Sequence, residues 1–214
     1  MQEFIRSLDE YFCEKYANYD SLCVLKGYKM PKMQTTEEID GIKRSYTLPP
    51  ETMRLALQEN KEELLKEVKK NAVDKSFSFS FFPLNWKRRL SNRFGVFGFK
   101  RVFEDILSKK KLTALEIEKG LTLESGVFKK VCKGSYLPTK NLVLSIALVG
   151  ELSMGETNRL LDACGEEWAY SQIKDTVVAY LLENKVFSLE LIKTAMAEYK
   201  VDNLFIELKK EERA

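Results

Sequence analysis

The positions of apolar residues along the chain follow two different periods, and these periods predict its secondary structure. Residues 2–17 carry apolar side chains three or four positions apart, which is typical of an amphipathic helix packed on a core. Pro50 is expected to begin a second helix, which extends to about Asn71 with one apolar edge and one charged edge. Residues 76–82 read SFSFSFF, and this strict alternation predicts a β-strand with one buried aromatic face.

The strand predicted at residues 76–82 needs a partner, because an isolated strand with an aromatic face would aggregate. Residues 43–48 are the candidate partner, and the Asp40-Gly41 dipeptide before them is suited to a hairpin turn. We therefore expect a small antiparallel sheet packed on the two N-terminal helices. Alternating aromatic residues also occur on surfaces that stack single-stranded bases, but the absence of charge from these seven residues makes this the weaker alternative.

From residue 99 onward the pattern is helical, and capping residues divide it into short helices. Residues 100–108 are predicted to form the first of these helices. Its expected inward residues are Val102, Phe103, Ile106 and Leu107. Gly120 ends the next helix, at residues 113–119, and is expected to adopt the left-handed conformation of a helix C-terminus. The residues predicted to be buried together in this and the following helices are Leu115, Phe128, Val131, Ile146 and Leu160.

Three further helices follow with clear boundaries. One is expected over residues 124–133, and a second runs from its cap at Thr139 to Gly150. Ser153 and Glu156 have the spacing of a capping box and open a third helix, which ends at Gly165. A helix, a short turn, a second helix bearing lysines and two packing helices together follow the plan of a helix-turn-helix unit. The helices predicted after residue 165 enlarge its core or build a dimer surface, and the sequence leaves both alternatives open.

Seven residues of this stretch match a recurring pattern of motifs. The pattern consists of an aromatic-x-Pro-x-Lys motif, an alanine-containing helix and a Leu-Leu pair before a glycine. The matching residues are Tyr136, Pro138, Lys140, Ala147, Leu160, Leu161 and Gly165. The stretch resembles a lambda-repressor-like (Cro or XRE-type) helix-turn-helix domain, in a bacterial variant. The resemblance implies a helical DNA-binding domain that regulates transcription.

The net charge of +3 is unevenly distributed along the chain. Residues 83–111 contain nine Lys and Arg against two Asp and Glu, whereas residues 141–214 contain eight against thirteen. Two alternatives therefore stand for the basic cluster around Trp86: an arm that contacts phosphates, or a linker kept soluble by its charge. The acidic C-terminal third is suited to water or to a protein partner.

The chain contains no histidine, and this absence excludes several chemistries. Nucleophiles activated by histidine and HExxH zinc sites both require that residue. The four cysteines lie far apart and are expected to be reduced thiols rather than disulfides or zinc ligands. The sequence also lacks a phosphate-binding P-loop, an apolar run of 18 residues and a secretory signal pattern. We expect a cytoplasmic protein that is not an enzyme and uses no cofactor or metal.

The resulting fold hypothesis is a mainly α protein with three regions. Residues 1–82 form an N-terminal α+β region that contains the small antiparallel sheet. Residues 83–98 form a basic linker or arm. Residues 99–214 form a lambda-repressor-like helical domain with extra C-terminal helices.

The resulting functional hypothesis is a transcriptional regulator that binds double-stranded DNA. Modest sequence specificity is expected, because the second motif helix carries no Arg, Asn or Gln. The candidate DNA-contacting residues are Ser125, Lys129, Lys130, Lys133, Ser135, Tyr136, Lys140, Arg88 and Arg89. The alternative is a protein-interaction adaptor that retains the helix-turn-helix fold without the DNA role. A protein partner or a homodimer is compatible with both hypotheses.

Overall fold

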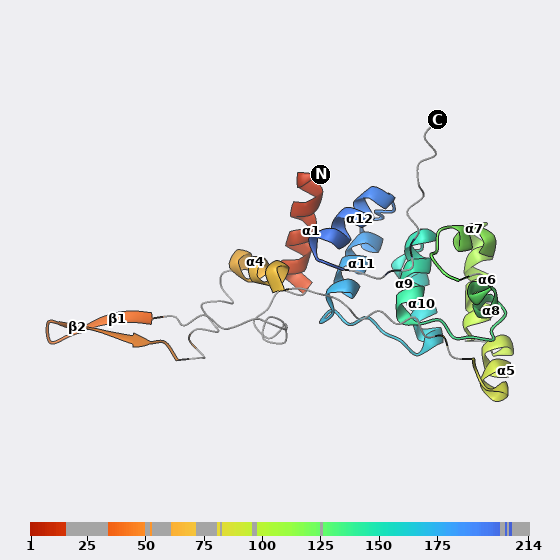
Figure 1. Ribbon diagram of the computed structural model, residues 1–214, viewed down its shortest axis with the longest axis horizontal. Coiled ribbons are helices and arrows are strands. Elements are labelled where there is room, and N and C mark those ends of the chain that lie inside the picture. Colours follow the sequence, from red (N-terminus) through yellow and green to blue (C-terminus); the bar gives the residue numbers. More distant parts are fainter. Residues whose placement is uncertain are drawn as a thin grey trace.

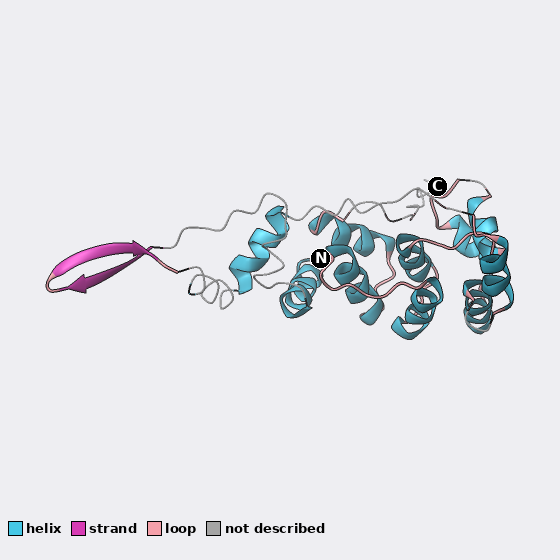
Figure 2. Cartoon of the chain, turned by 90° about the horizontal axis from the view of Figure 1, so that it is seen from below, coloured by secondary structure: helices cyan, strands magenta, loops and turns pink. Residues whose placement is uncertain are grey.

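The computed structural model describes residues 1–15, 34–49, 52, 61–71, 81, 83–95, 98–124, 126–201, 204 and 206, and this part is mainly helical (Figure 1). Its sheet is a hairpin of β1 (Gln34–Ile39) and β2 (Ile42–Thr47). The helices are α1 (Gln2–Lys15), α4 (Lys61–Asn71), α5 (Trp86–Phe94), α6 (Phe99–Lys110), α7 (Ala114–Lys119), α8 (Val127–Cys132), α9 (Lys140–Val149), α10 (Met154–Cys164), α11 (Ile173–Glu183) and α12 (Leu189–Glu198). Among the described segments, only the hairpin forms strands (Figure 2).

The hairpin turn lies at Asp40-Gly41, as the sequence predicted. Both residues have positive φ, 52° and 73°, a conformation that glycine adopts freely and aspartate tolerates. In the described sheet β2 pairs with β1, so its partner there is a segment that the sequence analysis did not consider. The predicted strand at residues 76–82 lies outside the described residues except for Phe81.

Helix α1 packs against α11, so the two ends of the described chain share one core (Figure 1). The ring of Phe12 stacks on that of Tyr199, with 3.7 Å between centroids, and the Tyr199 hydroxyl donates to Asp9 at 2.8 Å. Lys69 of α4 forms ion pairs with Asp9 at 2.7 Å and with Glu198 at 2.6 Å. Among the described residues, α1 and α4 therefore share one core with the C-terminal helices.

Helices α6, α8, α9 and α10 contain most of the expected core. The predicted inward residues of α6 are all buried, and so are Phe128, Val131, Ile146 and Leu160. The expectation for Leu115 is wrong: its side chain is 59% exposed, and Ile117 is buried instead. Residues two positions apart on a helix point in nearly opposite directions, at about 100° per residue, so only one of the two can face the core.

The caps of these helices follow the sequence closely, with one exception. Thr139 caps α9, the Ser153–Glu156 capping box opens α10, and Gly165 ends α10 with a φ of 73°. Gly120, expected to be left-handed, has a φ of −93°. Glycine is required there for a different reason: a Cβ at this position would lie 2.5 Å from Cγ1 of Val149.

The segment 83–98, expected to be a linker or arm, contains helix α5. Asn85 caps this helix by accepting a hydrogen bond from the Arg88 amide at 2.9 Å. Asn92 is buried, and its side chain accepts from the Phe99 amide at 2.8 Å, which joins α5 to the start of α6. Two asparagines therefore order a stretch whose charge had indicated a solvated linker.

Candidate nucleic-acid interface

Helix α8 carries its lysines on the side opposite its buried residues. Phe128 and Val131 are three positions apart, so they share the face that packs into the core. Lys129, Lys130 and Lys133 are all exposed. Three positive charges therefore lie within and directly after a helix of six residues.

The turn that follows α8 holds one of these charges in place. Backbone amides of Ser135 and Tyr136 donate to the Lys130 carbonyl, at 2.9 Å and 3.3 Å. The Lys130 ammonium lies 5.2 Å from the centroid of the Tyr136 ring, within the range of a cation–π interaction. Tyr136 is partly buried, so its ring orients Lys130 from a fixed position.

Helix α5 and the residue before its N-cap, Leu84, are attached to the same turn by three hydrogen bonds. Arg89 Nη2 donates to the Ser135 hydroxyl at 3.0 Å, and the Asn92 side chain donates to the Gly134 carbonyl at 3.3 Å. The Leu84 amide donates to the Ser135 carbonyl at 3.0 Å. Arg89 and Lys133 consequently line one open groove of about 310 Å³, together with Trp86, Leu90, Phe94, Gly134 and Ser135.

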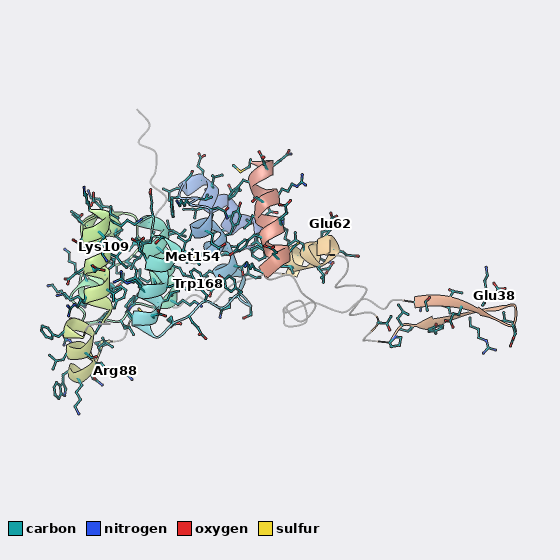
Figure 3. All side chains as sticks on the ribbon, turned by 180° about the vertical axis from the view of Figure 1, so that it is seen from behind. Glu38, Glu62, Arg88, Lys109, Met154 and Trp168 are labelled. Atoms are coloured by element: carbon teal, nitrogen blue, oxygen red, sulfur yellow. The ribbon has the colours of Figure 1, made fainter. Side chains whose placement is uncertain are left out.

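Two of the predicted contact residues do not join this group, and the position of a third is not described. Lys140 forms an ion pair with Asp175 and is only 15% exposed, because the first turn of α9 packs beside the start of α11. Arg88 projects from α5 (Figure 3) and lines a separate groove with Leu137 and Cys164. Ser125 lies outside the described residues. The structure therefore brings together Lys129, Lys130, Lys133, Ser135, Tyr136 and Arg89.

A buried polar network between α9 and α11 explains the position of Lys140. Lys174 and Asp175 are each 1% exposed, and the Lys174 ammonium donates to Asn141 Oδ1 at 3.2 Å. Burial raises the pKa of the Asp175 carboxyl, although Lys140 and the Ala169 amide both favour its ionised form. The local sequence pattern does not predict this network. Its only local signal is a Lys-Asp pair within an apolar helix.

The cysteines of this region have environments that suppress thiolate chemistry. Burial raises the pKa of Cys132 to about 11, and the nearby Glu118 carboxylate adds to the shift. Burial likewise raises the pKa of Cys164.

In the described ranges, no set of three or more potential ligands of the His, Cys, Asp or Glu type is arranged around a metal position. None of the described helices combines the length and apolar character needed to span a membrane.

No protein-family model, curated protein or solved structure matches this chain. The resemblance to lambda-repressor-like domains therefore stays a prediction, based on the seven motif residues. Beyond the motif residues, the structure gives the order and the caps of helices α6 to α10 and shows exposed cations on α5 and α8.

Proposed function

We propose that the protein binds double-stranded DNA through α8 and α5. The observation that supports this proposal is the groove shared by Arg89 and Lys133, beside the exposed Lys129 and Lys130. These four cations come from two helices that are distant in sequence, and the hydrogen bond from Arg89 to Ser135 fixes their relative position. Closely spaced phosphates are the natural ligands of such a cluster, because their neutralisation releases condensed counterions.

The chemistry of the four side chains favours modest sequence specificity. A lysine ammonium is a compact point charge that attracts phosphate without reading a base edge in bidentate fashion. Arg89 is the one guanidinium of the four, and one of its nitrogens is committed to Ser135. A regulator built in this way would gain most of its affinity from the DNA backbone.

The salt dependence of binding to a mixed-sequence duplex tests this proposal. Four phosphate contacts predict a log–log slope of about −3.6, taking roughly −0.9 per phosphate. Replacing Lys129 and Lys130 with Ala should flatten the slope by about 1.8. The matched control replaces the exposed Lys66 of α4 and Lys193 of α12 with Ala, which changes the net charge equally. An equal flattening by both double variants, or no binding at low salt, would overturn the proposal.

A protein-interaction adaptor is the second candidate function. It is favoured by the large apolar side chains that α5 exposes: Trp86, Leu90 and Phe94. If the parent protein does not bind duplex DNA at low salt, the adaptor function becomes the preferred one.

A further inference from the structure

Helix α5 is amphipathic, but it exposes its apolar side chains and buries a polar one, the reverse of the usual arrangement. Trp86, Leu90 and Phe94 are four positions apart, so they form one stripe along the helix. Their side chains are 68%, 48% and 66% exposed. Among the side chains of α5 whose burial is described, the buried one is polar: Asn92, whose amide group bonds to Gly134 and Phe99. A surface helix ordinarily turns its apolar stripe to the core, whereas this stripe is largely accessible to a binding partner.

The residues around the stripe are positively charged, so they determine which charge a binding partner must carry. Helix α5 contains Lys87, Arg88, Arg89 and Arg93 and no acidic residue. Lys133 approaches the stripe from the end of α8, and no Asp or Glu is among the described residues that line the groove. An occupant that matches this surface must therefore combine apolar groups with negative charge.

A symmetric dimer through this surface is disfavoured by its charge. In a two-fold interface each patch faces its own copy, so the cations of α5 and Lys133 would face one another. Like charges brought together in this way oppose association.

Single-stranded nucleic acid matches the charge of the surface but not its apolar centre. Stacked bases need successive aromatic faces, whereas the aliphatic Leu90 separates Trp86 from Phe94 along the stripe. Aromatic, aliphatic and arginine side chains together are typical of the centre of a protein interface.

We propose that the stripe of Trp86, Leu90 and Phe94 docks an acidic amphipathic helix of another protein. The stripe extends over about 12 Å, at 1.5 Å per residue, which matches anchor residues on successive turns of a partner helix. Apolar anchors of that helix lie on the stripe, and its carboxylates face Arg89 and Lys133. This surface shares Arg89 and Lys133 with the proposed DNA-binding cluster, whereas Trp86, Leu90 and Phe94 are not part of that cluster, so the docking does not require the DNA function.

The direct test measures binding of a synthetic helical probe to the full-length chain. The probe is a fluorescently labelled peptide of about 18 residues with Leu at every third or fourth position and Glu elsewhere. A second peptide, with lysine in place of each glutamate, keeps the apolar stripe and reverses the charge, so it tests the electrostatic match. We expect the acidic peptide to bind at least ten times more tightly than the basic one, by fluorescence anisotropy. Binding should also shift the emission of the exposed Trp86 to shorter wavelength.

Two leucine variants assign the binding to α5. Leu90→Ser should weaken binding of the acidic peptide at least tenfold. Leu115→Ser changes a leucine on α7 that is at least as exposed as Leu90, and it should leave binding unchanged. Both positions are exposed, so thermal melts should show that both variants remain folded.

Three results would overturn the proposal. The first is equal affinity for the acidic and basic peptides, and the second is an equal loss with Leu90→Ser and Leu115→Ser. The third is binding of an oligo-dT strand, but not of the acidic peptide, that Leu90→Ser abolishes. That last result would assign the stripe to single-stranded nucleic acid.

Discussion

The Arg89 guanidinium donates a hydrogen bond to the Ser135 hydroxyl, with 3.0 Å between Nη2 and Oγ, and so connects residues 46 positions apart. Asn92 and Leu84 make two further hydrogen bonds to the same turn, so α5 cannot rotate freely against α8. Ser135 therefore orients Arg89, and the charges of the two helices present a fixed pattern to any polyanion.

Lys140 is held in an ion pair with the buried Asp175, whereas the lysines of α8 are exposed. Lys140→Met should lower stability by about 3 kcal/mol, because it leaves the buried Asp175 carboxylate without its closest cation. The salt dependence of DNA binding should stay unchanged, since this lysine is not available to phosphate. Thermal melts and the salt titration measure the two effects separately. A flattened slope with an unchanged melting temperature would restore Lys140 to the DNA-contacting set.

Ile146 and Leu115 were both expected in the core, and the structure separates them. Ile146 is fully buried, so Ile146→Ala should cost about 2–5 kcal/mol of stability. Leu115→Ala should change stability by less than about 0.5 kcal/mol, because its side chain is exposed. Denaturant unfolding of the two variants measures both values. Comparable losses for the two variants would contradict the burial described for α7.

Much of the helical part could be predicted because its signals act within one helix. The cap of Thr139, the Ser153–Glu156 box and the left-handed Gly165 each depend on residues no more than a few positions away. The orientation of α7 could not be obtained in this way, since Leu115 and Ile117 are equally apolar and only packing chooses between them.

Long-range contacts also decide where the predicted site residues lie. Residues 83–98 were interpreted as a basic linker or arm from their charge, whereas Asn92 of α5 is fixed by Gly134, 42 residues away. Lys140 looked like a phosphate ligand because its partner, Asp175, belongs to a different helix. For α8 the local pattern was sufficient. Its buried and exposed positions lie within six residues, so its exposed lysines could be predicted from the sequence of the helix itself.

Gly120 lies against Val149, and this contact predicts a reciprocal pair of substitutions. Gly120→Ala should destabilise the protein by about 1–3 kcal/mol, because the new methyl group overlaps Val149 Cγ1 and valine has little rotamer freedom. Adding Val149→Ala should recover part of this loss. Gly155→Ala is the control, since no atom lies within 4 Å of its Cβ position and alanine favours helices. Strict additivity of the Gly120 and Val149 effects in a double-mutant cycle would contradict the steric account.

Tyr199 predicts a loss of stability at alkaline pH. Burial and the hydrogen bond to Asp9 raise the pKa of its phenol above the usual 10.0. The folded chain therefore keeps a proton that the unfolded chain releases, so this stability is present below pH 10 and is lost as the pH rises further. For Lys69, burial alone would lower the pKa, but hydrogen bonds to Asp9 and Glu198 raise it overall, so its contribution is lost in the same direction, above pH 10.5.

A conservative variant isolates the contribution of the phenol. Tyr199→Phe keeps the ring against Phe12 and removes the titrating group. Above pH 10 its free energy of unfolding should fall less steeply than that of the parent, by up to about 1.4 kcal/mol per pH unit. Urea unfolding at a series of pH values measures the slope, and parallel curves for parent and variant would rule out this role of Tyr199.

The contact between α1 and the C-terminal helices also has a consequence during synthesis on the ribosome. Asp9 and Tyr199 are 190 residues apart, so the first helix emerges long before its partner has been translated. At 5–20 residues per second this delay is about 10–40 s. Throughout that interval Phe12 lacks the Tyr199 ring that later stacks on it, so this apolar side chain stays accessible to a chaperone. The contact between α1 and Tyr199 can therefore form only after the segment around α12 has been translated.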